Sequence, residues 1–395
     1  MDPSASDSPP LAARGLAGVA VDVTAISEID GARGELRYRG YPIEALALLP
    51  FVDVVGLVID GELPVSGAEG VRVQKDAEET RTIRRALAEA RPLTVAQEKL
   101  LAILPRDTHP MTMLEVALPL GDDAAAKRAP VLSARPAQRA ALLSLAAKVP
   151  TLVAAWLRIR EGKSPIAPDP ARSNHADFLR MLTGEVPSAD EVALLDATQI
   201  LQMEHGLNAS TFAARVVAST LSPMSLALSA GVAALYGPLH GGADEAAYRM
   251  ALAIGEPDRV PAWVDAALAR KEKIMGLGHR EYRVVDPRAV VLRGLAQKVA
   301  DQKGLGPVLR TLGRVDDYAA EVFTRQGKAI RANVEFYKGA VFASLGLPPD
   351  AFTALFVMAR IFGWGAHVLE LWDDHKLYRP SAVYRGHARR SLPAT

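Results

Sequence analysis

Apolar residues recur at helical spacing along most of the chain. Residues 137–160 repeat leucine, alanine and valine every three or four positions, and Pro150 is a candidate kink in this helix. Residues 352–369 are mostly apolar and carry one charge, Arg360, which predicts one long buried helix with a single charge in its middle. A further helix is indicated by four apolar residues at the same spacing, namely Val291, Leu292, Leu295 and Val299.

Polar signals mark where these elements begin and end. Ser188 is followed three residues later by Glu191, a capping box that predicts a helix start. Residues 80–89 resemble a polar, arginine-rich helix surface, and residues 19–23 and 36–38 are short strand candidates around an Asp-Gly turn. We therefore expect a mainly α fold with a short N-terminal β element.

One uncharged stretch, residues 216–243, is long enough to cross a membrane. It contains serine, threonine, glycine and proline throughout, so we interpret it as two buried helices of a protein core. Residues 1–14 are polar and lack the apolar centre of a signal peptide, and we interpret them as a disordered tail. A cytoplasmic protein is expected.

The composition narrows the class of function. The chain has 395 residues, no cysteine and a formal net charge of +1. Its length suits two domains or one large one. The nearly balanced charge does not favour binding to nucleic acid or to an anionic membrane. The lack of cysteine excludes disulfides, cysteine nucleophiles and cysteine metal sites.

Three histidines lie in glycine-rich segments. His205 is in Glu-His-Gly-Leu-Asn, His240 is in Pro-Leu-His-Gly-Gly, and His279 is in Gly-Leu-Gly-His-Arg. Glycine lets the backbone approach a ligand closely, and imidazole can exchange protons near neutral pH. Each histidine alone could be a helix cap in a turn, but three together favour a catalytic site. No HExxH or HxxxH spacing is present, so no metal is expected.

Charged residues supply a second set of candidates. Glu335 precedes two aromatic residues and an apolar run, where burial could raise the pKa of a carboxyl group and make it a base. Arg360 lies within an apolar helix and therefore needs an anionic partner, from the protein or from a ligand. Arg288 and Arg379 could be solvated surface charges or could bind a carboxylate in bidentate fashion. Several arginines with several histidines fit a small di- or tricarboxylate.

From Gly15 to Tyr384 the chain resembles the citrate synthases, of the shorter bacterial and archaeal kind. The matching motifs occur in the family's order, at residues 29–31, 36–40, 205–220, 237–245, 274–288, 333–339, 360–370 and 379–380. The resemblance implies a homodimer of mostly helical subunits. It implies a large domain of residues 15–241 and 346–395, and a small domain of residues 242–345.

The resemblance also implies the reaction of the tricarboxylic acid cycle that joins acetyl-CoA to oxaloacetate, giving citrate and CoA, with no tightly bound cofactor. His240 would hydrogen-bond the thioester carbonyl, Glu335 would take the methyl proton, and His279 would polarise or protonate the ketone. Oxaloacetate would be held by His205, Arg288, Arg360 and, from the partner subunit, Arg379. Acyl-CoA would contact Arg39, Ile274, Gly276, Leu277, Gly278 and Arg283.

Four positions depart from the family pattern. Glu335 stands where aspartate is usual, Asp244 where asparagine is usual, Leu277 for an aromatic residue and Glu281 for an apolar one. We attribute the acidic residue at 244 to helix capping and the helix dipole. Two alternatives stay open: a 2-methylcitrate synthase that accepts propionyl-CoA, alone or with acetyl-CoA, and a catalytically weak paralogue that binds CoA or a dicarboxylate.

Overall fold

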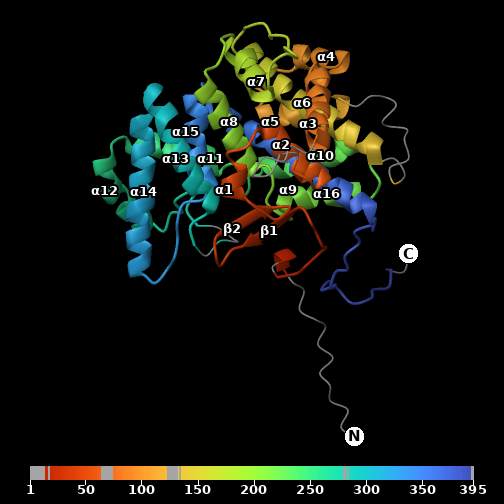
Figure 1. Cartoon of the computed structure of the whole chain (residues 1–395). Coiled ribbons are helices and arrows are strands. Elements are labelled where there is room, and N and C mark those ends of the chain that lie inside the picture. The colour runs from red at the N-terminus through yellow and green to blue at the C-terminus, as the bar shows by residue number, and fades with distance from the viewer. Residues whose placement is uncertain are drawn as a thin grey trace.

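The computed structural model describes residues 14–16, 18–63, 74–121, 132, 135–278, 282 and 284–392, without the side chains of residues 14, 74–80 and 298. The tail expected at residues 1–14 lies outside this part, apart from Arg14. Helices dominate the described residues (Figure 1). The larger group of helices comprises α1 (Ile43–Leu46), α2 (Phe51–Asp60), α3 (Gln74–Ala90), α4 (Val95–Ile103), α5 (Pro110–Ala117), α6 (Arg135–Arg160), α7 (Asn174–Thr183), α8 (Ala189–Gln202), α9 (Ala209–Ala218), α10 (Met224–Tyr236) and α16 (Phe352–Asp373).

A second group of helices lies side by side at one flank of the molecule (Figure 1). It comprises α11 (Ala243–Ile254), α12 (Val260–Ala269), α13 (Pro287–Gln302), α14 (Gly306–Arg325) and α15 (Val334–Ser344). These helices fall within the residues 242–345 expected to form a small domain, and that boundary stays a prediction. Short 3-10 turns occur at η1 (Arg14–Leu16), η2 (Leu118–Gly121), η5 (Pro257–Arg259) and η6 (Pro349–Ala351).

Helix α16 is the centre of the larger group. It packs against α2, α6, α9 and α10, and its most apolar 18-residue window is 100% buried. Close approach requires glycine on the facing helix, because a Cβ at Gly231 of α10 would lie 2.8 Å from the ring of Trp364. Helices α6 and α16 are long and apolar enough to cross a membrane, but both are buried inside the protein, so they are core helices.

The local sequence signals account for most of these elements. The Ser188 capping box forms, since Ser188 accepts from the Glu191 backbone N–H and Glu191 accepts from that of Ser188. Helix α6 runs through Pro150, and the uncharged stretch forms the two helices α9 and α10. The predictions of these helices are confirmed.

The N-terminal β element is a three-stranded antiparallel sheet of β1 (Ser27–Asp30), β2 (Glu35–Tyr38) and β3 (Tyr41–Pro42), with Ile29 opposite Leu36. The strand expected at residues 36–38 is confirmed. The strand expected at residues 19–23 is wrong: that segment forms no strand, and Val23 is 84% exposed. A strand needs a neighbour to pair with its backbone, and the partner of β2 is the segment four residues beyond Val23.

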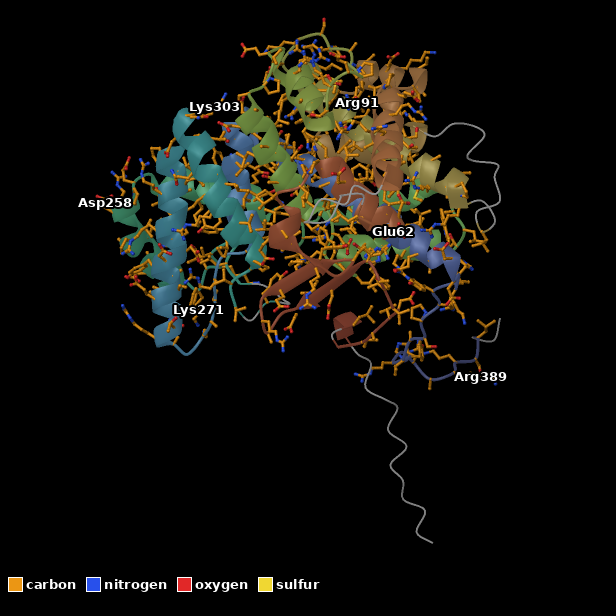
Figure 2. The ribbon with its side chains drawn as sticks, viewed as in Figure 1. Glu62, Arg91, Asp258, Lys271, Lys303 and Arg389 are labelled. Carbon is orange, nitrogen blue, oxygen red and sulfur yellow. The ribbon has the colours of Figure 1, made fainter. Side chains whose placement is uncertain are left out.

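The two groups of helices are joined by an ion pair at the surface. Lys303 at the end of α13, labelled in Figure 2, places its Nζ 2.6 Å from Oε1 of Glu191 at the start of α8. Lys303 is 46% exposed, so the pair contributes little stability on its own. It nevertheless marks where one group of helices contacts the other.

Candidate active site

His240 lies in the turn between α10 and α11, and its imidazole is held by a serine. Its Nε2 atom is 2.8 Å from Oγ of Ser210, in the first turn of α9. Burial lowers the pKa of His240 to about 4, with a further contribution from the positive charge of Arg360. The ring is therefore neutral at pH 7 and can donate one hydrogen bond.

Ser210 belongs to a hydrogen-bond network that orients this ring. Its Oγ accepts from Nε1 of Trp364 at 3.1 Å and donates to Oδ1 of Asn208 at 2.8 Å. Asn208 caps α9, and its Oδ1 already accepts from two backbone N–H groups. A ligand oxygen at Nδ1 would select the tautomer with the imidazole proton there, and the Ser210 hydroxyl would then turn its hydrogen from Asn208 to Nε2 of His240. Nδ1 would then be the donor toward a ligand.

His205 lies just before α9 and is 7% exposed. Its Nε2 atom lies 3.2 Å from the hydroxyl of Tyr282. The next residue, Gly206, has φ +60, a left-handed conformation in which a side chain would be strained. The glycine beside His205 therefore turns the chain from α8 into α9.

Arg288 is buried and paired, so its interpretation as a solvated surface charge is wrong. Its Nε and Nη2 atoms donate to the two carboxylate oxygens of Asp286 at 3.0 and 2.8 Å, and it is 1% exposed. Asp286 also caps α13 and accepts from the backbone N–H of Val334 at 3.1 Å. The same carboxylate thus holds Arg288 beside the start of α15, the helix that carries Glu335.

Arg360 is 2% exposed within α16. Its Nε donates to the carbonyl of Gln202 at 2.8 Å, and its guanidinium lies 4.6 Å from the centroid of Phe356. Among the residues the structure describes, no carboxylate lies within 4.0 Å of this guanidinium. A buried arginine without a close protein anion fits the expectation that a ligand carboxylate completes the pairing.

Glu335 is the second residue of α15 and is half-buried. With its amide turned to donate, Asn333 places its nitrogen 3.3 Å from Oε2 of Glu335 and 2.9 Å from the carbonyl of Gly276. The negative charge of Glu335 acts on His240, Arg288 and Arg360, whose pKa values it raises after larger contributions from burial. These groups therefore lie near enough to Glu335 for its charge to act on them.

The segment 274–278 is tied to the start of α15. Leu277 forms an antiparallel bridge with Ala332, and the backbone N–H of Gly278 donates to the carbonyl of Arg331 at 2.8 Å. Gly276 has φ +80, and a Cβ there would lie 2.9 Å from the ring of Phe336. Only glycine allows this approach, so the segment and Glu335 are fixed relative to each other.

Asp244 has a partner that capping does not explain. It is fully buried, its Oδ1 accepts from the backbone N–H of Glu245 at 2.8 Å, and its Oδ2 lies 3.3 Å from Nζ of Lys338. The attribution of Asp244 to capping and the helix dipole is therefore incomplete. Within the core, the ammonium of α15 is its counter-ion.

Other predicted residues lie apart from this group or outside the described residues. Arg39 is half-buried, but its Nη2 donates to the carbonyl of Val58 at the end of α2. Arg379 is exposed and bonds only its neighbour Pro380 within the described chain. His279, Glu281 and Arg283 lie outside the described residues.

Sequence reasoning missed four residues that shape the site: Ser210, Tyr282, Asp286 and Lys338. Ser210 follows the helix cap Asn208 by two positions, and Asp286 precedes a proline at a helix start, so both could have been noticed as capping residues. Lys338 is three residues after Glu335, on the same side of a helix. Nothing in the sequence names the partners of these residues.

Comparisons with known proteins show which family the chain is similar to. The family model described as the citrate synthase C-terminal domain matches residues 15–381. A 2-methylcitrate synthase of Mycobacterium tuberculosis is 38% identical over 98% of this chain and 94% of its own length. A citrate synthase of Synechocystis is 38% identical over 96% of this chain and 93% of its own length.

A solved structure supports the fold. The citrate synthase of Thermoplasma acidophilum, solved with carboxymethyl coenzyme A and oxaloacetate, has a TM-score of 0.85 and 29% identity over 95% of this chain and 96% of that one. The expected helical fold with a short N-terminal β element is thus confirmed. The chain belongs to the citrate synthase family, and it is an acyltransferase of the type that converts the acyl group into an alkyl group on transfer.

Proposed function

We propose that this protein condenses acetyl-CoA with oxaloacetate and water to give citrate and CoA. The observation that carries the proposal is the electrostatic interaction of Glu335 with a neutral His240 and with the buried cation Arg360, which lacks a close anion within the described residues. A donor, a base and an anion site are what an enolising condensation requires.

His240 and Glu335 would form the nucleophile. Glu335 removes a proton from the methyl carbon of acetyl-CoA while Nδ1 of His240 donates to the thioester oxygen, so the charge that develops there is stabilised. The enol carbon then attacks the ketone carbon of oxaloacetate, whose oxygen receives a proton from His279. Water finally cleaves the thioester, releasing citrate and CoA.

Oxaloacetate would be held by its two carboxylates. Arg360 offers a guanidinium that lacks a close anion within the described residues. Arg288 donates to Asp286 through Nε and Nη2, and its Nη1 takes no part in that pairing. His205 would add a neutral or charged donor beside Tyr282. The Thermoplasma structure was solved with oxaloacetate present, which supports this ligand class.

Acyl-CoA would lie along the segment 274–278, where backbone and apolar groups can contact the adenine. The fixed geometry of Gly276 and Leu277 against α15 supports this role, because it holds segment 274–278 next to the start of the helix that carries Glu335. Arg39 and Arg283 are proposed phosphate contacts. Movement of the second group of helices toward the first would exclude water during condensation.

The proposed enzyme is a cytoplasmic homodimer in which Arg379 reaches the oxaloacetate site of the partner subunit. Exposure of Arg379 and its lack of other bonds within the described chain support this role. Tyr378 holds the segment in place, since its hydroxyl accepts from Arg215 at 2.9 Å and its backbone N–H donates to Ser219.

Propionyl-CoA is the alternative acyl donor, because the 38% identical Mycobacterium protein is named as a 2-methylcitrate synthase. One methylene changes selectivity by only about 1–3 kcal/mol, so both donors need testing. The experiment is CoA release with oxaloacetate, comparing acetyl-CoA with propionyl-CoA. Higher kcat/KM with acetyl-CoA supports the main proposal, and higher kcat/KM with propionyl-CoA replaces it. Absence of turnover with both would favour the catalytically weak paralogue.

A further inference from the structure

The core beside Glu335 contains an ion pair that the proposed chemistry does not use. Lys338 of α15 and Asp244 of α11 are both 0% exposed, and their Nζ and Oδ2 atoms lie 3.3 Å apart. Neither atom makes a hydrogen bond of good geometry to any residue the structure describes. Buried charged atoms without hydrogen bonds are rare in proteins, and this pair therefore requires an explanation.

Stability does not supply that explanation. Removing two charges from water costs several kcal/mol for each ion in general, and a buried ion pair is often no better than apolar residues of the same shape. Burial lowers the pKa of Lys338 and raises that of Asp244, and each charge opposes the effect of burial on the other. The pair thus exists at a cost to the fold.

Packing fixes the pair rigidly. Helices α11 and α15 approach so closely that a Cβ at Gly339 would lie 2.5 Å from the carbonyl oxygen of Asp244. The ammonium of Lys338 lies 3.6 Å from the ring centroid of Phe356 on α16, and the guanidinium of Arg360 lies 4.6 Å from the same ring. The lysine therefore cannot move away from its neighbours.

The charges facing Lys338 come from every element around it. Asp244 is on α11, Glu335 is on α15 itself, Arg360 is on α16, and His240 is in the turn before α11. Glu335 and Lys338 are three residues apart on one helix, which places them about 5–6 Å from each other at Cβ. The negative charge of Glu335 helps to keep Lys338 protonated, after the larger effects of burial and Asp244.

We propose that Lys338, with Asp244 as its counter-ion, is a positioning residue that keeps the carboxylate of Glu335 ionised in the closed core. Without the neutralising ammonium, the buried Asp244 and the half-buried Glu335 would be two like charges that repel each other, which favours protonation of both carboxylates. A protonated Glu335 cannot act as a base. The inference rests on the proposed function only in that it names Glu335 as that base.

The test uses Lys338→Met, Asp244→Asn and the double variant that combines these two changes. Lys148→Met serves as the control. Lys148 is a matched control, because it is a buried lysine 6% exposed on α6 whose ammonium bonds Ala90 and Ser144. In the pH profile of kcat/KM, we expect Lys338→Met to move the midpoint of the acid limb to higher pH by about one pH unit or more. Lys148→Met should lower thermal stability without moving the limb, and the double variant should restore the limb toward that of the wild type. An unmoved limb in folded Lys338→Met overturns the proposal.

Two further measurements keep the inference testable. If Lys338→Met does not fold, Asp244→Asn should have a lower acid limb than the double variant, and coincident limbs contradict the proposal. If the wild type releases no CoA, the proposed function fails, and the carboxyl carbon of Glu335 is then titrated directly by NMR. Its signal is assigned by its loss in Glu335→Gln. Equal midpoints in the wild type and Lys338→Met would overturn the inference independently of activity, as would equal midpoints in Asp244→Asn and the double variant if Lys338→Met does not fold.

Discussion

Oγ of Ser210 lies 2.8 Å from Nε2 of His240, thirty residues further along the chain. The serine also accepts from Trp364 of α16, so three separate elements determine how the imidazole is oriented. This arrangement presents Nδ1 as the remaining ring nitrogen of a neutral histidine.

The first prediction concerns this serine. Ser210→Ala should lower kcat by about 10- to 100-fold, because an imidazole that can rotate is misplaced for most of the time. KM for oxaloacetate should change little, since the arginines are the proposed ligands of that substrate. Ser222→Ala, in the turn before α10, is the control and should keep full activity. A kcat of Ser210→Ala within twofold of the wild type would remove the serine from the mechanism.

The second prediction concerns pH and His240. Its pKa is about 4 in the folded protein and 6.5 as the ordinary value, so the unfolded chain binds a proton first as the pH falls. Stability from the neutral ring is therefore complete above pH 6.5 and declines between pH 6.5 and 4. The urea unfolding midpoint of the wild type should fall more steeply across this range than that of His240→Gln. His387→Gln, at an exposed position, should behave like the wild type.

The third prediction concerns the carbon base. Glu335→Gln preserves the size of the side chain and removes its basicity, so kcat should fall about 100-fold or more. Oxaloacetate binding, measured by calorimetry, should stay within a few-fold, and Glu335→Asp should retain measurable turnover. Glu321→Gln on the exposed side of α14 is the control. Full turnover by Glu335→Gln would show that another group takes the methyl proton.

The fourth prediction concerns Arg379 and the homodimer. Dimers of Arg379→Ala and dimers of Glu335→Ala should each be inactive. After subunit exchange, each hybrid would contain one intact site, and about one quarter of wild-type activity should return at equal mixing. Exchange is checked by native mass spectrometry. Exchanged but inactive hybrids would place Arg379 and Glu335 in the same subunit's site.

The same prediction can be tested at its anchor. Arg215 is 1% exposed and supports Tyr378, so Arg215→Met should loosen the segment that carries Arg379. KM for oxaloacetate should rise, with a smaller change in kcat. Arg249→Met, which removes an exposed arginine paired with Glu245, is the control. An unchanged KM in folded Arg215→Met would separate the anchor from the substrate.

Local patterns were enough to predict the long helices and the capping box. Helices α6 and α16 follow from apolar spacing, and Ser188 with Glu191 forms its cap without help from distant residues. The first strand was misplaced at residues 19–23, because a strand exists only where another strand pairs with it. Sequence spacing describes one chain segment, while pairing is a property of two.

The candidate residues were also visible in the sequence, through motifs and resemblance, but their partners were not. By sequence alone, Arg288 is as consistent with a surface charge as with a buried one, and its pairing with Asp286 in the structure decides between them. Capping accounts for only part of the environment of Asp244, because Lys338 lies beside it. In each case the residue type was known and its environment was not.

The sequence by itself determined a mainly helical protein of the citrate synthase family, with a defined set of histidines, arginines and one glutamate as candidates. Only the tertiary structure decided which charges are buried together and which side chain orients each of them. The physical reason is that removal from water makes a charge depend on its neighbours. Those neighbours are brought by helices from distant parts of the chain, so packing, rather than local sequence, sets the chemistry of Glu335, His240 and Lys338.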